Sequence, residues 1–341
     1  MLSFLNDYSE GAHLRILNAL ADTNLEQTCG YGLDHYCQDA VELIRQKCAA
    51  PEADVHFVVG GTQANLLVIH ALLHSFEAVI AADTGHVNVH ETGAIEATGH
   101  KVCTIPSPDG KLTPALVRQV IEAHSTEHMV RPRLVYISDT TEIGTFYTQS
   151  ELTALHRCCK ENHLLLYLDG ARLSSALTAD GNDLTLEDLA ILTDAFTIGG
   201  TKNGALFGEA IILKNAALQP DFRFYIKQRG AMLAKGRLLG IQFFQLLKDD
   251  LYFEIGRHAN KMAASIRDAL LAEGYPCPYD SRTNQIFPIL PNAVIEKLSR
   301  VCAFEISRPV DANHCMVRFV TSWATAEDAV KEFSAALSAC R

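Results

Sequence analysis

Short apolar runs rich in β-branched residues alternate with stretches of helical periodicity over the first two thirds of the chain. A parallel strand is buried on both faces, so it reads as a continuous apolar run, and it needs a crossover, usually a helix, before the next strand. The alternation therefore predicts an α/β fold with a mainly parallel seven-stranded sheet and helices on both faces. The expected strands are 55–60, 78–83, 101–106, 133–138, 164–169, 195–200 and 209–213, and the expected helices include 64–74, 114–124, 149–162 and 186–192.

The chain has 341 residues, which exceeds the size at which a single hydrophobic core stops growing, so two domains are expected. After Lys214 the pattern changes to a long helical region and then to shorter pieces. We expect a large α/β domain over residues 1–249 and a smaller α+β domain over residues 250–341. The helical region runs from Ile226 to Phe253 and on to Glu273, and the later pieces are 285–290, 314–323 and a closing helix at 325–337.

The formal charge of −11 argues against a nucleic-acid partner, because the chain has neither a basic surplus nor a block of Lys and Arg. The amino terminus carries Asp7 and Glu10 where a secretory signal would carry lysines, and no apolar stretch is long enough to span a bilayer. We therefore expect a cytosolic protein that binds neither nucleic acid nor membrane. The ten cysteines are scattered without a C-x-x-C pair, which indicates buried free thiols rather than a disulfide framework.

Two apolar runs end in groups that suit one cofactor. The segment LLLYLDGARLSSAL places Asp169 and Arg172 after one expected strand, and AFTIGGTKNGALFGEAIIL places Lys202 after the next. Because parallel strands collect ligand groups at their carboxyl ends, these side chains are expected to meet. A pyridoxal phosphate enzyme needs such groups: Lys202 to form the Schiff base, Asp169 to keep the pyridine nitrogen protonated, and Arg172 to bind anionic oxygen. The alternatives are a surface lysine in a turn and an aspartate that caps a helix.

Two glycine-containing turns complete the expected cofactor site. Two glycines and Thr201 precede Lys202, so the backbone can turn sharply and present the amine inward, with Thr201 beside the cofactor. In VHFVVGGTQANLLVIHALL a strand, two glycines and a helix follow one another, which places the amides of Gly61 and Thr62 at a helix amino terminus, where anions bind. Neither the Walker pattern nor G-x-G-x-x-G is present, so a single phosphate monoester fits better than a nucleotide.

His86 follows the expected strand 78–83, in DTGHVNVHETGA, where an imidazole could lie flat on an aromatic cofactor and exchange protons. The competing interpretation is a metal site, because His86 and His90 are spaced i, i+4 and Glu91 is next. The H-E-x-x-H motif is absent, and we predict no metal. Glu142, in SDTTEIGT at the end of the expected strand 133–138, is either a second carboxylate of the pocket or a helix cap.

Taken together, these motifs resemble the threonine aldolase branch of the β-eliminating lyases, pyridoxal phosphate enzymes of the aspartate aminotransferase fold, which is fold type I. The resemblance covers nearly the whole chain, and the set of motifs is specific although no single piece is. It implies a large cofactor-binding domain followed by a smaller one. The matching segments are FLNDYSEGAH at the start, GYGLD (30–34), GGTQAN (60–65), GHVNVHETGAIEATGHKV (85–102), ISDTTEIGT, LDGARL, GGTKNGA, KQRGAMLAKG (227–236) and VRFVTSWAT near the end.

The resemblance implies how the cofactor is held. Lys202 matches the Schiff-base lysine, Asp169 the carboxylate at the pyridine nitrogen, and His86 the residue that stacks on the ring. Gly61 and Thr62 match the phosphate site. The cofactor implied is pyridoxal 5′-phosphate.

The resemblance also implies the substrate site. Arg172 and Arg318 are expected to hold the substrate carboxylate, with Asn6 helping from the amino terminus and Tyr31 contributing. Family members often have serine at the position of Asn6, and many have histidine where this chain has Glu142.

The family is built of dimers whose sites use residues from both chains. A homodimer or a homotetramer is therefore implied for this chain. Tyr31, Lys227 and Arg229 are the candidates for groups that reach across. The negative net charge does not oppose such an assembly, since local complementarity decides association.

The leading hypothesis is a retro-aldol cleavage of L-threonine or L-allo-threonine to glycine and an aldehyde. The two arginines would fix the carboxylate so that the Cα–Cβ bond stands perpendicular to the cofactor ring. The base for the β-hydroxyl proton is His86, Glu142 or a water that they hold. The alternatives are a β-eliminating lyase or an aminotransferase with the same cofactor, a metal hydrolase built on His86 and His90, and a noncatalytic member of the fold.

Overall fold

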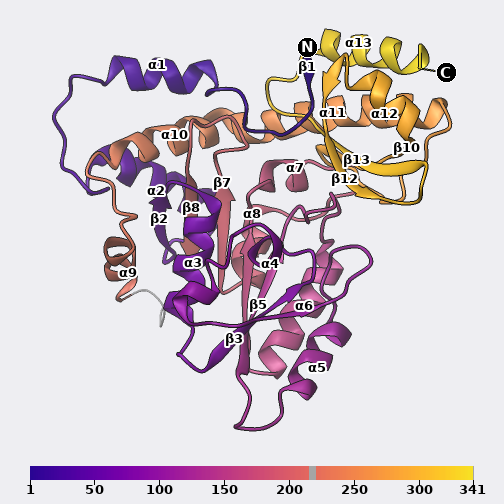
Figure 1. Ribbon diagram of the computed structural model, residues 1–341. Coiled ribbons are helices and arrows are strands. Elements are labelled where there is room, and N and C mark those ends of the chain that lie inside the picture. Colours follow the sequence, from indigo (N-terminus) through magenta and orange to yellow (C-terminus); the bar gives the residue numbers. More distant parts are fainter. Residues whose placement is uncertain (215–219, 341) are drawn as a thin grey trace.

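A seven-stranded sheet forms the centre of the larger part of the molecule (Figure 1). The computed structural model describes residues 1–214 and 220–340. The strand order is β2-β8-β7-β6-β5-β3-β4, and neighbouring strands are parallel except that β8 is antiparallel to both β2 and β7. The predicted mainly parallel α/β sheet is confirmed. The strands are β2 (Asp54–Val58), β3 (Glu77–Ala82), β4 (Val102–Ile105), β5 (Arg131–Ser138), β6 (Leu165–Asp169), β7 (Ala195–Gly199) and β8 (Glu209–Leu213).

The reversed direction of β8 follows from its short link to β7. Residues 200–208 contain no helix, and the amide of Gly200 donates to the carbonyl oxygen of Gly208 (2.9 Å), which closes a turn. Without a crossover the chain can only return antiparallel to the strand it has left. The turn therefore places Glu209 directly opposite Gly199, beside Lys202.

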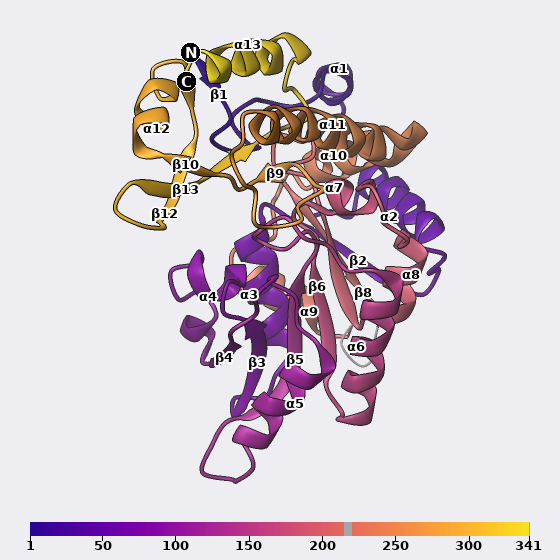
Figure 2. The same cartoon turned by 90° about the vertical axis from the view of Figure 1, so that its right-hand side faces the viewer.

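Both faces of the sheet are covered by helices (Figures 1 and 2). In β6, Leu166 and Leu168 belong to one hydrophobic core, and Leu165 and Tyr167 belong to the core on the other face. Burial on both faces explains why the strands read as continuous apolar runs. No helix in the described part of the chain is both long and apolar enough to cross a membrane. The helices here are α1 (Leu14–Asp22), α2 (His35–Lys47), α3 (Gly61–Leu72), α4 (His86–Val89), α5 (Pro114–Ala123), α6 (Gln149–Glu161), α7 (Leu173–Leu177), α8 (Leu186–Leu192), α9 (Phe222–Gln228) and α10 (Arg237–Leu247), with short 3₁₀ helices at Glu96–Thr98 and Lys248–Asp250.

Side-chain caps fix where several of these helices begin. Thr148 and Thr185 each form a capping box, at the start of α6 and α8. Asp34 caps α2, and Thr113 caps α5, which has proline in its first turn. Each cap accepts a hydrogen bond from an amide that has no partner inside the helix. The four predicted helices correspond to α3, α5, α6 and α8, with ends that differ by up to three residues.

The carboxy-terminal part forms a smaller sheet with its own core, as the upper parts of Figures 1 and 2 show. The order is β10-β13-β12, and β9 also pairs with β13. The amino terminus joins this part, because β1 pairs in parallel with β11, and Phe4 packs on Phe319 and Phe333. The boundary between two domains at residues 249 and 250 stays a prediction. The elements are β1 (Leu2–Ser3), α11 (Leu251–Ala272), β9 (Gln285–Ile286), β10 (Ile289–Pro291), α12 (Asn292–Leu298), β11 (Cys302–Ala303), β12 (Glu305–Pro309), β13 (His314–Val320) and α13 (Glu327–Ser338).

The sequence predicted one long helical region from Ile226 to Glu273. The region is helical but is divided into α9, α10 and α11, so the predicted continuity was wrong. α9 ends before Gly230, which has a φ of +70°. α10 and α11 are separated at Asp249 and Asp250, which have φ values of +54° and +58°. A left-handed residue cannot continue a right-handed helix, and helical periodicity alone does not reveal such breaks.

The ten cysteines are all free, as the sequence predicted. Seven of them are buried, including the adjacent Cys158 and Cys159 in α6. Burial raises the pKa of Cys159, which keeps this thiol protonated at neutral pH. These cysteines therefore act as small apolar side chains of the core.

We predict that Gly256→Ala destabilises the protein, because α11 packs closely on α7 at this position. A Cβ at Gly256 would lie 2.2 Å from the carbonyl oxygen of Ser174. The overlap should lower the free energy of unfolding in urea by about 1–3 kcal/mol. Gly11→Ala is the control, since a Cβ there meets nothing within 4 Å. Equal stability of the two variants would contradict the close contact.

Candidate functional site

One cavity of about 260 Å³ opens at the carboxyl ends of β2, β5, β6 and β7. Strands that run in the same direction present these ends along one edge, so residues distant in sequence meet there. Every residue that the sequence predicted for cofactor binding or catalysis lines this cavity. These residues are Gly61, Thr62, His86, Glu142, Asp169, Arg172, Thr201 and Lys202.

Three hollows of the surface are larger but contain none of the predicted site residues, and the smallest of the three, about 440 Å³, lies beside Lys111, Phe146 and Tyr279. The first, about 780 Å³, lies between α11 and residues 277–282. The second, about 770 Å³, lies at the opposite end of the sheet, where β3 and β5 begin. The smaller cavity is therefore the candidate site because of its chemistry, not its size.

Lys202 lies in the turn between β7 and β8, and buried Asn203 fixes that turn. The Asn203 side-chain amide donates to the carbonyl oxygens of Gly199 (2.7 Å) and Ala171 (3.1 Å). The second bond ties the turn after β7 to the turn after β6. Lys202 and the end of β6 are therefore held at a fixed relative position.

The amine of Lys202 forms no hydrogen bond and no ion pair within residues 1–214 and 220–340. Burial, together with the nearby guanidinium of Arg172, lowers the pKa of this amine below its ordinary value. Three carboxylates act in the opposite direction without reversing the shift: Asp7, Asp169 and Glu209. A lysine with a lowered pKa carries a larger fraction of the free amine, which is the nucleophilic form.

Asp169 ends β6 and is held by three donors. Its Oδ2 accepts hydrogen bonds from Asn65 Nδ2 (2.8 Å) and from the Tyr136 hydroxyl (2.8 Å). Its Oδ1 accepts from the backbone amide of Ala171 (3.0 Å). These bonds offset the desolvation of a buried acid and fix the direction of the carboxylate.

His86 begins α4, and a second buried acid lies behind its ring. The Nδ1 atom of His86 lies 2.8 Å from Oε1 of Glu91. The same oxygen accepts from Asn65 Nδ2 (2.7 Å), the amide group that also donates to Asp169. The Tyr167 hydroxyl donates to the other end of this amide, Asn65 Oδ1 (2.8 Å). One asparagine thus connects the acid behind His86 with the acid at the end of β6.

Glu142 lies above the end of β5 and is bound through one oxygen. Its Oε1 accepts from the backbone amide of His86 (2.9 Å) and from the Ser138 hydroxyl (2.7 Å). Burial raises the pKa of Glu142 above its ordinary value, although both of these bonds act to lower it. The sequence left two alternatives for Glu142, a carboxylate of the pocket or a helix cap. The residue fulfils both, because it binds the first amide of α4 and lines the cavity.

The amino terminus of α3 points at the cavity. Its N-cap, Gly60, provides no side chain to bind the first amides of the helix. A Cβ at Gly60 or Gly61 would meet nothing within 4 Å, so the space beside these amides is open. Thr201 lines the same space, and its hydroxyl accepts from the amide of Gly208 (3.0 Å). Free amides at the start of a helix suit an anion such as a phosphate group.

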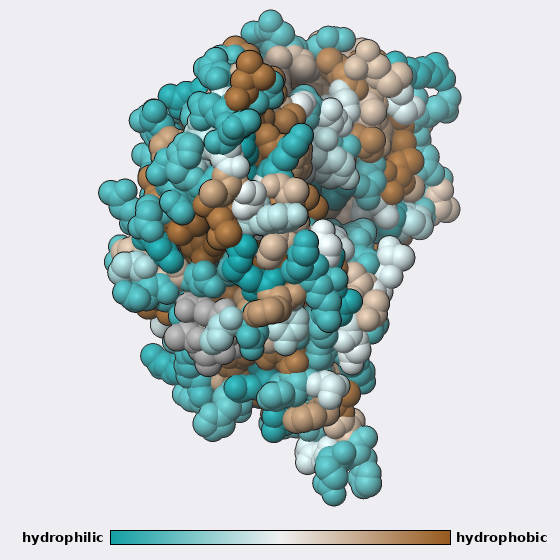
Figure 3. Space-filling view, turned by 90° about the vertical axis from the view of Figure 1, so that its left-hand side faces the viewer, coloured by the Kyte–Doolittle hydropathy of each residue, from teal (hydrophilic) through white to brown (hydrophobic). Residues whose placement is uncertain are grey.

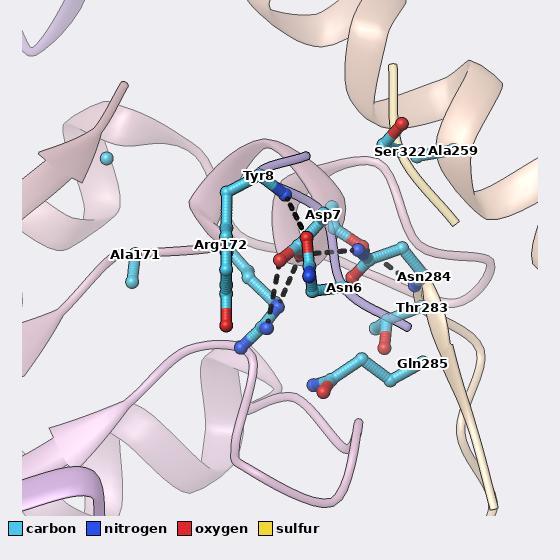
Figure 4. A network of polar contacts seen from close by, with 12 residues as sticks. Asn6, Asp7, Tyr8, Ala171, Arg172, Ala259, Thr283, Asn284, Gln285 and Ser322 are labelled. Atoms are coloured by element: carbon cyan, nitrogen blue, oxygen red, sulfur yellow. Dashed lines mark hydrogen bonds and ion pairs between the residues drawn. The ribbon is translucent and has the colours of Figure 1, made fainter. Parts of the chain in front are cut away.

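Arg172 forms a two-pronged ion pair with Asp7 from the amino-terminal segment (Figure 4). Its Nε and Nη2 atoms donate to the two carboxylate oxygens at 2.7 and 3.1 Å. Asn284 Nδ2 also donates to Asp7 (2.9 Å). Burial alone would raise the pKa of Asp7, but Arg172 and its other neighbours lower it. Asn6 lies beside this pair, and its side chain binds the amide of Tyr8 (2.9 Å).

Arg318 lies in β13, opposite Glu305 of β12, with which it forms an ion pair. Its Nη1 also donates weakly to Gln285 Oε1 (3.5 Å), and its buried Nε has no partner among the described residues. Burial, followed by the charge of Arg172, lowers the pKa of Arg318. The two guanidinium groups are thus close enough to repel each other, although one follows β6 of the large sheet and the other lies in β13 of the carboxy-terminal part.

Tyr31, Lys227 and Arg229 lie outside this cavity in the same chain. The Lys227 amine lies 4.9 Å from the centre of the Tyr31 ring, and Arg223 donates to the Tyr31 carbonyl oxygen (3.2 Å). Tyr31 and Arg229 are exposed. The predicted contact of Tyr31 with substrate is therefore not made within one chain.

The residues of the alternative metal site have other partners. The rings of His86 and His90 are 5.6 Å apart, and His86 Nδ1 binds Glu91. Burial, followed by the charge of His86, lowers the pKa of His90. No group of three or more metal-ligating side chains occurs in the part of the chain that the structure describes.

Several polar residues of the site were not predicted from the sequence. Asn65 is a polar residue inside the apolar helix α3, and that contrast could have identified it. Glu91 was considered only as a neighbour of a metal site. Asp7 and Asn284 had no local signal, because Asp7 binds Arg172 and Asn284 binds Asp7, and both contacts join segments more than 160 residues apart.

A family model for β-eliminating lyases matches residues 15–288. Two curated relatives are low specificity L-threonine aldolases of Pseudomonas. The Pseudomonas aeruginosa protein is 32% identical and covers 97% of this chain and 95% of its own length. The protein of a further Pseudomonas species is 33% identical and covers 98% of this chain and 97% of its own.

Solved structures agree with these matches. A threonine aldolase from Leishmania major is 51% identical, has a TM-score of 0.99 and covers 99% of both chains. An aspartate aminotransferase from Thermus thermophilus has a TM-score of 0.72 at 17% identity and covers 98% of this chain and 89% of its own. At that identity the likeness shows the fold alone, and the predicted aspartate aminotransferase-like fold is confirmed.

We predict that Asp139 makes stability depend on pH near neutrality. It follows Ser138 in the turn after β5, and burial raises its pKa to about 8. The unfolded chain releases this proton near pH 4 while the folded chain keeps it, so stability falls as pH rises from about 4 to 8. Asp139→Asn should remove up to roughly 5 kcal/mol of that fall, measured by urea unfolding at several pH values.

The control for this prediction is Asp39→Asn on the exposed face of α2. This variant should follow the wild-type pH dependence. Parallel stability curves for wild type and Asp139→Asn would show that Asp139 is already ionised in the folded protein.

Proposed function

Because the chain belongs to the β-eliminating lyase family, we propose that it is a pyridoxal phosphate-dependent aldolase that cleaves L-threonine and L-allo-threonine to glycine and an aldehyde. The observation that carries the proposal is the Lys202 amine, which has no partner in the described residues and lies in one cavity with Asp169 and His86. The two curated relatives that match nearly the whole chain, and a solved structure 51% identical to it, are threonine aldolases.

The residues of the cavity fit pyridoxal 5′-phosphate. The open amides at Gly61 and Thr62, with Thr201, would bind the phosphate, and Asp169 would bind the pyridine nitrogen. Lys202 would attach the cofactor covalently through its amine. When bound, the cofactor withdraws electrons from the substrate bond that breaks.

Arg172 and Arg318 support binding of an α-carboxylate. Both side chains are largely buried. An anion placed between the two guanidinium groups would be attracted by each of them and would also offset their mutual repulsion. Asp7 already occupies two donors of Arg172, so the substrate would use the remaining N–H groups, two on Nη1 and one on Nη2. Asp7 then acts by orienting the guanidinium rather than by touching the substrate.

The test of this function uses purified protein with pyridoxal phosphate and L-threonine. We expect aldehyde and glycine to form in equal amounts, measured by a coupled alcohol dehydrogenase assay and by amino-acid analysis. Release of ammonia together with a keto acid would instead indicate a β-eliminating lyase, and a keto acid formed without ammonia, in the presence of a keto-acid acceptor for the amino group, would indicate an aminotransferase. Either result without aldehyde contradicts the proposal.

Lys202→Ala should abolish the cleavage, whereas Lys101→Ala, which changes an exposed lysine at the start of β4, should not. Borohydride reduction of the wild-type protein followed by peptide mapping should place the pyridoxyl adduct on Lys202. An adduct on any other lysine would overturn the assignment.

We propose that the protein works in the cytosol as a dimer or tetramer whose sites combine residues of two chains. Large apolar side chains are exposed on the amino-terminal segment, at Leu14, Leu25 and Leu33, and on α9 at Phe224. Figure 3 shows patches of apolar surface on the side of the molecule that carries α1 and α9. Tyr31, with Lys227 over its ring and Arg229 two residues further along the chain, would reach the partner's cavity from this side.

Shared sites predict that two inactive variants complement each other. Lys202→Ala and Arg229→Ala subunits, unfolded together and refolded, should regain about a quarter of the wild-type activity, because half of random dimers are mixed and each mixed dimer has one intact site. The two variants refolded separately and then assayed together are the control. No recovery in dimers shown to be mixed would place Arg229 outside the partner's site.

A further inference from the structure

We infer that the Nε2 atom of His86 accepts the β-hydroxyl proton, and that Glu91, held by Asn65, is the positioning residue that prepares His86 for this step. The inference rests on the proposed aldolase function and decides among the bases that the sequence left open. It assigns roles to Glu91 and Asn65, which were not among the predicted site residues.

The first argument is the direction of the His86 ring. Nδ1 lies 2.8 Å from Oε1 of Glu91, whose side chain is fully buried, so this nitrogen faces the protein interior. A carboxylate can only accept, so Nδ1 keeps its hydrogen and Nε2 carries the free lone pair. His86 lines the cavity and is about one-third exposed there. The free nitrogen is thus the one opposite Glu91, on the cavity side of the ring.

The second argument is that the orientation of Asn65 is fixed from both ends. The Tyr167 hydroxyl has Asn65 Oδ1 as its acceptor, so the amide nitrogen must face the two carboxylates. The two hydrogens of Nδ2 then match the two acceptors, Oε1 of Glu91 (2.7 Å) and Oδ2 of Asp169 (2.8 Å). A flipped amide would direct its oxygen at both acids. Glu91 is therefore held by the same group that holds Asp169.

The third argument is the cost of burying Glu91. Its Oε2 is buried without a hydrogen-bond partner among the described residues. A buried carboxylate with one unpaired oxygen lowers the stability of a protein unless its charge is offset by a neighbouring group that becomes positive. The group in contact is His86, and a carboxylate beside an imidazole stabilises the imidazolium that forms when the ring takes up a proton.

Glu142 is the less suitable base. Its Oε1 accepts two hydrogen bonds, from the amide of His86 and from Ser138, so that oxygen is committed to holding the start of α4. Burial raises the pKa of Glu142, so the carboxyl keeps a proton at higher pH than an ordinary glutamate. Glu142 is suited to donate a proton, and His86 is suited to accept one.

The step balances as follows. The β-hydroxyl proton passes to His86 Nε2, and the electron pair of the O–H bond becomes the second bond of the aldehyde C=O group. The Cα–Cβ bond breaks, and its electron pair stays with Cα. A proton later adds to Cα and completes glycine, and His86 returns its own proton to solvent.

The test compares Glu91→Gln with Glu96→Gln, an exposed glutamate five residues along the chain. Glu91→Gln keeps the shape and removes the charge. We expect its kcat for threonine cleavage to fall by roughly 10- to 100-fold with little change in KM, since general acid–base catalysis contributes about 10²- to 10⁴-fold. Exchange of the glycine Cα hydrogen in heavy water involves no β-hydroxyl and should fall by a much smaller factor. Glu96→Gln should match wild type in both assays.

A second experiment asks whether Glu91 acts through His86. His86→Phe keeps a flat ring and removes the base, and in that background Glu91→Gln should cause no further loss of cleavage. Unfolding temperatures of the four proteins without cofactor give a readout that does not depend on activity. Glu91→Gln should change the unfolding temperature by different amounts in the wild-type and His86→Phe backgrounds, because the two side chains are in contact.

The inference would be overturned by wild-type kcat in Glu91→Gln, or by equal losses of cleavage and of glycine exchange, which would indicate a general structural defect. Losses that simply multiply in the double variant would also contradict it. A wild-type protein that cleaves no threonine would instead refute the proposed function. The coupling between Glu91 and His86 in the unfolding temperatures would still be measurable in that case.

Discussion

The site depends on burial of the large sheet on both faces. Leu165 to Leu168 alternate between two hydrophobic cores, and Asp169 is the first charged side chain of β6, at the edge where several polar groups meet. The donors at that edge, Asn65 and Tyr136, satisfy the acid and fix its direction. The other reactive groups are then placed by turns that leave the same edge. The geometry of the site is therefore a consequence of strand direction and strand length.

Local patterns were sufficient to predict the sheet, four of the helices that cover it and eight of the residues that line the cavity. Asp169 and Lys202 could be predicted because each ends an apolar run, and the carboxyl ends of such runs meet. The break of the long helical region at Asp249 and Asp250 could not be predicted, since both residues fit a helical period. β1 and β11 have two residues each, too few to show an alternating pattern.

The polar network around the cavity was the least predictable part. The Asp7–Arg172 pair and the Asn65 bridge join segments separated by more than 100 residues, and no local signal specifies such a pair. These contacts also carry a cost, because each charge loses its hydration on burial. Residues that satisfy one another in this way fix a single arrangement of the site, and a change in one partner leaves the other buried and unpaired.

The amino-terminal segment connects the two parts of the molecule. Leu2 and Ser3 are hydrogen-bonded to β11 of the carboxy-terminal part, and Asp7 is bound to Arg172 at the end of the large sheet. Residues 4–6 alone separate these attachments, and Phe4 among them is locked into the carboxy-terminal core. So short a segment has little freedom to extend. A rotation of the carboxy-terminal part that moves Arg318 toward or away from the cavity would therefore also move Asp7 and the Arg172 guanidinium bound to it, so the two arginines would shift together.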